Sequence, residues 1–179
     1  VYTGYPLLLS EMTLLTALRT AATSAMAARY LAPKGAHTMA MIGNGAQSEF
    51  QCIAFAAVCG IKSVNLYDID RAASEKAARN LAGFGITTVI CDTPERAIQG
   101  AQIITTCTAD KQNATILTEN MIVEGVHINA IGGDCPGKTE LSARILERAT
   151  TFVEYPPQTR IEGELQQMSE DYPVTELWQ

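Results

Sequence analysis

The sequence predicts an α/β protein, a Rossmann-type doubly wound parallel sheet with helices on both faces. Short apolar runs alternate with segments of helical periodicity, which is typical of parallel sheets. One run, residues 38–42, ends in the glycine turn Gly43-Asn44-Gly45 and leads directly into a helix. The next run, residues 63–67, ends in Asp68, twenty-five residues after Gly43. A glycine turn followed at this distance by an acid is the pattern of a dinucleotide-binding fold.

The composition excludes several classes of protein. The 179 residues are enough for one domain with a sizeable core. The net charge of −6, without any basic run, argues against nucleic acid or an anionic membrane as a partner, and no apolar stretch reaches membrane-spanning length. The five cysteines include no Cys-x-x-Cys pair. We therefore expect no metal site, and buried thiols in a reducing compartment, the cytoplasm.

The first 36 residues predict an incoming strand at 1–9 and a long helix at 11–31, capped by Ser10 and ended by Pro33. One side of this helix carries a polar stripe at helical spacing, formed by Thr16, Arg19, Thr20 and Thr23. Arg19 is either a solvated side chain or a bidentate clamp for phosphate or carboxylate. The chain begins inside an apolar run and ends without a helix stop, so we expect it to be a piece of a longer protein.

The glycine turn has the pattern G-x-G-x-x-S. Gly43 would permit the tight turn, Gly45 would let the backbone approach a pyrophosphate, and Ser48 stands in place of the usual third glycine. A helix that starts at Ala46 or Gln47 would offer its free N–H groups to phosphate. The alternative is a glycine turn without a ligand, as any α/β protein can have.

The acid after the second strand refines this hypothesis. Asp68 is placed to bind the adenosine ribose hydroxyls, and its charge would repel a 2′-phosphate, which predicts NAD rather than NADP. Asp70 is a second candidate for the same role. The remaining elements follow in order: a helix at 71–82, a strand at 86–91, a short helix at 93–99, strands at 101–106 and 126–131, a helix at 139–148, a sixth strand at 151–154 and a helix at 160–169.

Two loops after strands are candidates for chemistry. In a doubly wound sheet the fourth strand lies beside the first, so Thr108 is expected near the cofactor, unless it is a simple turn threonine. The fifth strand leads into Gly132-Gly133-Asp134, where Asp134 either acts in catalysis or bonds its own turn. His127 lies inside a strand and His37 has no evident role. Since no Ser-His-Asp grouping is visible, a cofactor is expected to carry the chemistry.

Four segments together resemble the ornithine cyclodeaminase/mu-crystallin family: LTALRTAATSA at 14–24, IGNGAQSEFQ at 42–51, LYDID at 66–70 and NAIGGDCPGKTEL at 129–141. The resemblance covers essentially the whole chain. It implies that residues 1–36 link from a substrate domain that precedes Val1, and that residues 37–179 are an NAD-binding Rossmann domain whose completion follows Gln179. It also implies a homodimer, formed largely through the absent domain.

The resemblance assigns roles to individual residues. Arg19 is similar to an arginine that contacts the cofactor pyrophosphate and the substrate carboxylate, and Asp134 to the catalytic carboxylate, which contacts substrate and cofactor. The other cofactor-binding positions that it implies are Gly43 and Gly45 in the turn, Ala46 and Gln47 as backbone donors, Asp68 at the ribose, Thr108 in the groove, and Ile131, Gly132 and Gly133 beside the nicotinamide. Ser48 is the one departure from the generic glycine pattern.

The implied reaction converts L-ornithine to L-proline and ammonia, with hydride passed to and from bound NAD. Arg19 would orient the α-carboxylate, and Asp134 would hold the reacting amine and move protons. An alanine dehydrogenase or ketimine reductase on the same fold is one alternative, although Asp68 counts against NADP-using enzymes. A non-catalytic crystallin-like binding protein is another, against which the intact Asp134 and glycines argue.

Overall fold

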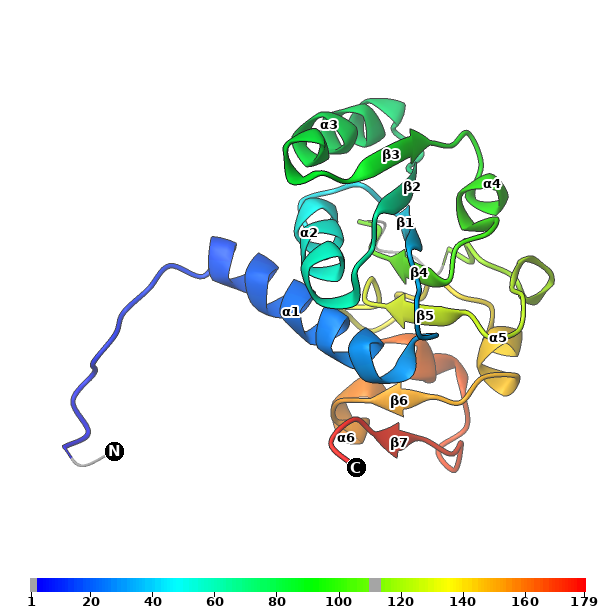
Figure 1. Cartoon of the computed structure of the whole chain (residues 1–179). Helices are drawn as coiled ribbons and strands as arrows, with labels where there is room; N and C mark the ends of the chain where they lie inside the picture. The colour runs from blue at the N-terminus through cyan, green and yellow to red at the C-terminus, as the bar shows by residue number, and fades with distance from the viewer. Residues whose placement is uncertain (1–2, 110–113) are drawn as a thin grey trace.

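The structure, a computed structural model, describes residues 3–109 and 114–179. Its centre is a five-stranded parallel sheet in the order β3-β2-β1-β4-β5 (Figure 1). The strands are β1 (Thr38–Ile42), β2 (Ser63–Tyr67), β3 (Thr87–Ile90), β4 (Ile103–Thr106) and β5 (His127–Ala130). This order, with β1 between β2 and β4, confirms the predicted doubly wound sheet and all five of its strands to within two residues at each end.

Helices cover both faces of this sheet (Figure 1). One face carries α1 (Thr13–Leu31), α2 (Ser48–Cys59) and α3 (Arg71–Leu81), and the other carries α4 (Pro94–Ile98) and α5 (Ala143–Glu147). The side chains of β1 alternate between the two cores: Met39 and Met41 pack with the first set of helices, Ala40 and Ile42 with the second. This period of two is that of a strand buried on both sides.

The register aligns the carboxyl ends of four strands. Ile42 at the end of β1 pairs with Tyr67 of β2 and with Thr106 of β4, and Thr106 pairs in turn with Ala130 of β5. The four loops that follow these strands therefore leave the sheet at one level and at one edge. In an open parallel sheet this edge, on both sides of β1, is where ligands bind.

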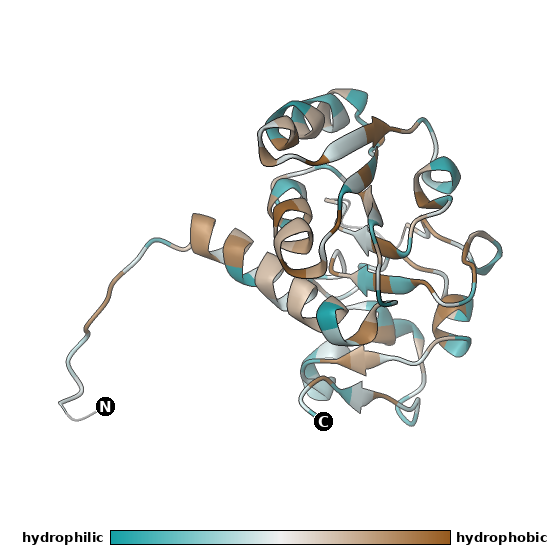
Figure 2. Ribbon diagram, in the orientation of Figure 1, coloured by the Kyte–Doolittle hydropathy of each residue, from teal (hydrophilic) through white to brown (hydrophobic). Residues whose placement is uncertain are grey.

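The amino-terminal prediction is wrong in two details. Residues 3–12 form no strand, and α1 begins at Thr13 rather than at residue 11. The carboxylate of Glu11, not Ser10, accepts from the N–H groups of Thr13 and Leu14. An acid at this position also suits the positive end of the helix dipole. The segment instead runs free of the fold, and part of it is coloured as hydrophobic (Figure 2). Large apolar side chains on it are exposed, among them Leu7, Leu8 and Leu9.

The helix predicted at 139–148 begins late. Residues 139–142 are extended, with a parallel bridge between Leu117 and Leu141, and α5 starts at Ala143 after the N-cap Ser142. The reason is tertiary, because the N–H groups of Glu140 and Leu141 donate to the carboxylate of Glu164, at 2.8 and 3.1 Å. Helix propensity is a weak preference that such contacts override.

The carboxyl-terminal predictions are also corrected. The predicted sixth strand is the two-residue β6 (Phe152–Val153), which pairs with β7 (Thr175–Glu176) outside the main sheet. The helix predicted at 160–169 is wrong. The two prolines start α6 (Pro156–Thr159), Gly163 then adopts a φ of 100°, and a 3-10 turn η3 (Glu164–Gln167) follows. Two further 3-10 turns are η1 (Ala82–Phe84) and η2 (Glu119–Met121).

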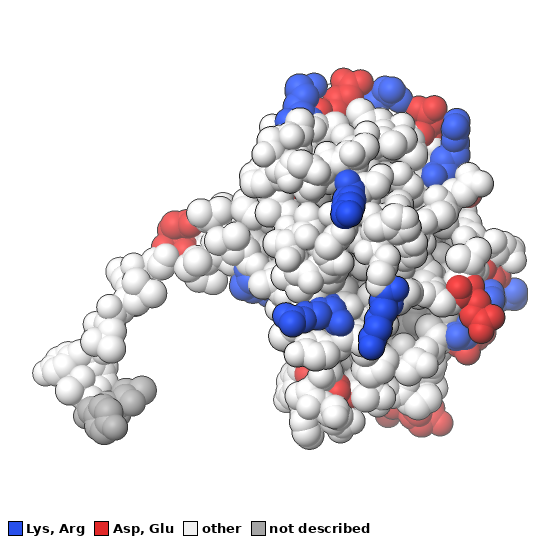
Figure 3. Space-filling view, viewed as in Figure 1, with Lys and Arg blue, Asp and Glu red and all other residues white. Residues whose placement is uncertain are grey.

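The described residues contain no helix long and apolar enough to cross a membrane. On the face in Figure 3, Lys and Arg side chains stand apart from one another, separated by neutral surface. The acids and bases mix at the end of the molecule that carries α3, where Arg71 pairs with Glu75 and Asp92. The surface on this side therefore offers no continuous basic stripe of the kind that tracks a phosphate backbone.

Gly43 and Gly45 make a matched pair for a test of the turn. Gly43 has a φ of 89°, and a Cβ there would lie 2.5 Å from the Cys107 carbonyl oxygen, whereas a Cβ on Gly45 would meet nothing within 4 Å. Gly43→Ala is therefore expected to lower the free energy of unfolding of the ligand-free, full-length protein by about 2–4 kcal/mol. Gly45→Ala should leave it nearly unchanged. Denaturant unfolding measures both, and equal stability of the two variants would contradict the prediction.

Candidate functional site

The glycine turn is fixed from both sides. Gly43 N–H donates to Tyr67 O at 2.8 Å and Asn44 N–H donates to Asp68 Oδ2 at 2.6 Å, so the turn is tied to the end of β2. Ser48 is fully buried, and its hydroxyl donates to Gly45 O at 2.8 Å. A serine thus fits where the third glycine usually lies, and it adds a bond that a glycine would lack.

The exposed tip of the turn has free donors. Gly45 and Ala46 are exposed, and no described residue accepts from the N–H groups of Ala46 and Gln47. Both groups lie immediately before α2, where the helix dipole adds positive potential. With open space over Gly45, this tip can receive an anionic group such as a phosphate. The helix start predicted at Ala46 or Gln47 is one or two residues early, but the donors are present.

The two acids after β2 have different roles. Asp70 accepts from Ala72 N–H at 3.0 Å and caps α3. Asp68 is partly buried and accepts from Asn44 N–H through Oδ2 and from Asp70 N–H, at 2.9 Å, through Oδ1. Since a carboxylate offers about four acceptor positions, Asp68 keeps capacity for two further hydroxyl donors. The geometry thus favours Asp68 over Asp70 as a ligand for a ribose.

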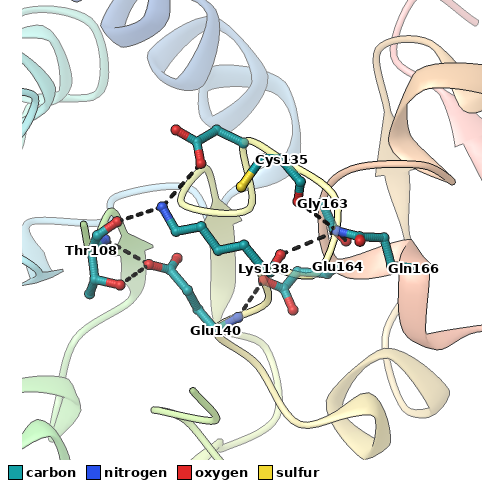
Figure 4. Close-up of polar contacts among 8 residues, drawn as sticks. Thr108, Cys135, Lys138, Glu140, Gly163, Glu164 and Gln166 are labelled. Atoms are coloured by element: carbon teal, nitrogen blue, oxygen red, sulfur yellow. Dashed lines mark hydrogen bonds and ion pairs between the residues drawn. The ribbon is translucent and has the colours of Figure 1, made fainter. Parts of the chain in front are cut away.

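The loops after β4 and β5 are joined by a lysine that the sequence reading missed. The Lys138 side chain is only 5% exposed, and its Nζ donates to Thr108 O at 2.9 Å and to Asp134 Oδ1 at 3.1 Å (Figure 4). Glu140 reaches the same threonine, because its Oε1 accepts from Thr108 N–H at 2.6 Å and from the Thr108 hydroxyl. The helix predicted over 139–148 hid this arrangement. In the structure this segment is extended, so Lys138 and Glu140, two residues apart, both reach Thr108.

The glycines before Asp134 are required by the protein itself. A Cβ on Gly132 would lie 2.0 Å from the Glu140 carboxylate, and one on Gly133 would lie 2.8 Å from the Gly163 Cα. Asp134 N–H donates to Gly132 O at 2.9 Å, so the backbone turns sharply, yet its side chain is 73% exposed. Among the described residues, Lys138 is the one partner of the Asp134 side chain, which is otherwise open to a ligand.

The turn η3 supports this loop from behind. Gln166 Nε2 donates to the carbonyl oxygens of Cys135, Lys138 and Gly163, at 3.2, 3.2 and 2.9 Å. Gly137 N–H donates to Gln166 Oε1 at 2.6 Å. Glu164 adds two more bonds, from the N–H groups of Glu140 and Leu141, so one glutamine and one glutamate make five hydrogen bonds to residues 135–141. The loop that carries Asp134 is therefore held in one conformation.

Arg19 is not drawn into these contacts. It is exposed on α1, and its guanidinium has no hydrogen bond or ion pair with any described residue. The hydroxyl groups of Thr23 and Ser24 bond the helix backbone, at Arg19 O and Thr20 O, rather than Arg19 itself. The predicted clamp is therefore a free cation on the helix surface. Ile131 continues the pairing of β5, with its N–H donating to Thr106 O at 3.1 Å.

Histidines and thiols have structural surroundings. His127 Nε2 bonds Asn129 Oδ1 within β5, and burial lowers the pKa of its ring. Burial raises the pKa of the Cys52 and Cys107 thiols to about 12, so both stay protonated. All five cysteines are free. Across residues 3–109 and 114–179, no group of three His, Cys, Asp or Glu side chains is arranged to hold a metal ion.

Glu164 makes the stability of this region depend on pH. Burial raises the pKa of its carboxyl to about 7, the N–H groups of Glu140 and Leu141 oppose that rise, and the nearby Glu140 carboxylate adds to it. The folded state therefore binds this proton more tightly than the unfolded chain. Its contribution to stability is present below the ordinary carboxyl pKa and is lost as pH rises to about 7.

We expect the free energy of unfolding of the full-length protein to fall, relative to Glu164→Gln, between about pH 4.5 and about pH 7. The slope should not exceed about 1.4 kcal/mol per pH unit, the limit for one proton. Urea unfolding at several pH values measures it, with Glu170→Gln, an exposed acid, as the matched control. Parallel pH profiles for the parent and Glu164→Gln would show that the Glu164 carboxyl has an ordinary pKa.

Comparison with known proteins places this arrangement in context. The chain is 66% identical, over 179 residues, to ornithine cyclodeaminase of Brucella suis biovar 1, a match that covers 100% of the chain and 50% of that protein. It is 34% identical to alanine dehydrogenase of Archaeoglobus fulgidus over 163 residues, 91% of the chain and 49% of that protein. The chain thus spans about half the length of the curated relatives it matches.

Solved structures agree with the fold. A lysine cyclodeaminase structure, studied with L-lysine, L-ornithine and L-2,4-diaminobutyric acid, superposes with a TM-score of 0.88 at 39% identity, over 93% of this chain and 48% of that one. An archaeal alanine dehydrogenase dimer with bound NAD gives 0.84 at 34% identity, over 92% and 50%. The family-level match extends over residues 1–179. The chain therefore belongs to the ornithine cyclodeaminase/mu-crystallin family.

Proposed function

We propose that this chain is the NAD-binding half of an ornithine cyclodeaminase, which converts L-ornithine to L-proline and ammonia. The observation that carries the proposal is the common edge of the sheet, where the free donors before α2, the Asp68 carboxylate and the exposed Asp134 follow aligned strands. Identity of 64–66% to proteins named ornithine cyclodeaminase, against 34% to an alanine dehydrogenase, supports the choice of substrate.

The residues at this edge fit NAD. The N–H groups of Ala46 and Gln47, with the open space over Gly45, suit its diphosphate, and Asp68 suits the hydroxyls of its adenosine ribose. Thr108 and the backbone of 131–133 would line the nicotinamide end. Bound NAD would supply the hydride acceptor and donor of the reaction, so that no net NADH forms.

The protein's own groups would orient the substrate and move its protons. Asp134 would accept a proton from the reacting amine at a carboxylate oxygen and return it later in the turnover. Lys138 Nζ, which donates to Asp134 Oδ1, would hold this carboxylate in place. Arg19, a free cation, would bind the α-carboxylate and a cofactor phosphate. A site closed to water is required, because an imine formed from ornithine would otherwise hydrolyse.

The rest of the protein would complete the site. We infer that residues 1–36 link from a preceding substrate domain and that residues 37–179 form the NAD-binding domain, within a cytoplasmic homodimer. The first segment and α1 carry exposed apolar side chains that support a covering partner, among them Tyr5, Leu7, Leu8, Leu9, Leu14 and Leu18. The archaeal alanine dehydrogenase named above is also a dimer.

An alanine dehydrogenase or ketimine reductase is the second candidate, favoured by the 34% identity to the Archaeoglobus enzyme. The products separate the two functions. With L-ornithine and catalytic NAD, the full-length cyclodeaminase should release proline and ammonia in equal amounts while the NADH absorbance stays flat. A steady rise of NADH with an amino acid would instead identify a dehydrogenase, and NAD binding without any turnover would identify a crystallin-like binding protein.

In the same assay, Asp134→Asn should reduce kcat at least about a hundredfold, since a general acid–base group contributes roughly 10²–10⁴. NAD should still bind, because the turn and Asp68 are unchanged; calorimetry with NAD alone checks this. Asp171→Asn, the same change at an exposed position, is the control and should keep the parent rate. Proline formation near the parent rate in Asp134→Asn would remove Asp134 from the mechanism.

Asp68 and Asp70 allow a matched test of cofactor choice. Asp68→Asn removes the charge but keeps an acceptor for Asn44 N–H, so the preference for NAD over NADP should fall roughly tenfold, about 1.4 kcal/mol. Asp70→Asn makes the same change at a residue that caps α3, where asparagine serves equally well, and should leave the preference intact. Dissociation constants for both cofactors decide. A larger shift in Asp70→Asn would move the ribose ligand to Asp70.

A further inference from the structure

We propose that Glu140 is a positioning residue of this site, whose buried carboxylate sets the distance between the loop after β4 and the loop after β5. The proposal rests on the proposed function, since it concerns the segments expected to flank the nicotinamide. Glu140 lies in the extended segment that follows the Asp134 loop, and it is 1% exposed. It cannot touch a ligand at the surface, so any effect on chemistry must pass through the residues it holds.

The first contact of Glu140 is with Thr108. A single carboxylate oxygen, Oε1, accepts from both the N–H and the hydroxyl of this residue (Figure 4). Lys138, two residues earlier, donates to the carbonyl oxygen of the same threonine at 2.9 Å. All three polar groups of Thr108 are therefore held by one short extended segment. Hydrogen bonds to charged groups are the stronger class, so Thr108, the second residue after β4, has one preferred position.

The second contact is with Gly132. The Glu140 carboxylate fills the space that a side chain at 132 would need, since a Cβ there would lie 2.0 Å from an oxygen and 2.1 Å from the carboxyl carbon. The remaining oxygen, Oε2, is buried and has no hydrogen-bond partner among the described residues. It thus serves as a spacer against Gly132 rather than as an acceptor. The same carboxylate therefore holds Thr108, after β4, and packs against Gly132, after β5.

The position of Glu140 is itself fixed. Its N–H donates to Glu164 Oε1 at 2.8 Å and the next N–H, of Leu141, donates to Oε2 at 3.1 Å. Its carbonyl accepts from Ile116 N–H at 2.8 Å. With the backbone held on both sides, the side chain has little freedom to follow a displaced loop. A change in length or hydrogen bonding at position 140 must therefore be absorbed by Thr108 and Gly132, and through Lys138 by Asp134.

The test uses three substitutions in the full-length protein. Glu140→Gln keeps the length and an acceptor oxygen for Thr108. Glu140→Asp keeps the charge but is one methylene too short to reach, and Glu140→Ala removes both. If Glu140 acts through the length of its side chain, Glu140→Gln should retain NAD affinity and kcat within about threefold. Glu140→Asp and Glu140→Ala should each lose roughly tenfold or more in both quantities, the size of one charge-assisted hydrogen bond. If Glu140→Asp matched the parent while Glu140→Gln lost NAD affinity and kcat, the charge of residue 140 rather than its length would matter, and the proposal would be wrong.

NAD affinity is measured by calorimetry without substrate, so this measurement can be interpreted even if no proline forms. A parent that binds NAD but releases no proline refutes the proposed function, and the affinities of the variants still decide the role of Glu140. Glu147→Gln, an exposed acid in α5, is the matched control. Circular dichroism and thermal unfolding establish that each variant is folded.

A milder substitution tests the proposal if the Glu140 variants do not fold. Thr108→Val removes only the hydroxyl donor to Glu140 and should weaken NAD binding severalfold in the same direction. Folded Glu140 variants that bind NAD and turn over like the parent overturn the proposal. So does the case in which every Glu140 variant unfolds while Thr108→Val binds NAD with the parent affinity, because Glu140 would then serve folding alone.

Discussion

The site depends on one constraint, the parallel register that brings Ile42, Tyr67, Thr106 and Ala130 to the same level of the sheet. Parallel strands carry all their carboxyl ends at one edge, and this register lets no strand overshoot its neighbours. As a result, the first residues after these four strands lie at one edge of the sheet. Each then needs only a few local bonds to be fixed: Gly43 to Tyr67, Asn44 to Asp68, Thr108 to Glu140.

The half of the site beyond β4 is built differently from the half at the glycine turn. Around the turn, backbone N–H groups bond a single carboxylate, Asp68, which is partly open to solvent. Beyond β4, charged side chains are buried beneath the loops, with Lys138 and Glu140 converging on Thr108 and Glu164 supporting the backbone. Lys138 and Glu164 have hydrogen-bond partners, whereas Glu140 is bonded through Oε1 and its Oε2 has no partner among the described residues. Hydrogen bonds to charged groups are stronger in the interior, and they limit the movement of the groups that they join. The Asp134 loop thus gains its rigidity from groups that are not themselves exposed.

The parts of the fold that could be predicted from sequence are those set by local pattern. Strand 38–42 could be located because apolar residues fill both faces and a glycine follows, and Asp68 because it ends the next such run. Residues 139–142 could not, because a helix-compatible sequence there is held extended by a carboxylate from position 164. The same is true of residues 160–167, where Gly163 must lie against Gly133. Long-range contacts of this kind leave no periodic trace.

Among the candidate site residues, the sequence located loops better than partners. Thr108 and Asp134 were each expected near the cofactor, and the structure joins them through Lys138, a residue that spacing alone did not single out. Arg19 was expected on a polar stripe, and it lies there, but the neighbouring hydroxyl groups bond the helix rather than the guanidinium. Which side chain bonds which is decided by the packing of separate elements, and so it became visible only in three dimensions.

The bond from Asn44 N–H to Asp68 Oδ2 has a consequence for cofactor engineering. The side chain that would discriminate between dinucleotides also fastens the loop that would receive their phosphates. Substitutions that open room at position 68 for an extra phosphate, such as glycine or alanine, would release that loop at the same time. Relaxed selectivity would then be accompanied by weaker overall affinity, so a useful redesign must find a new acceptor for Asn44 before it discards the old one.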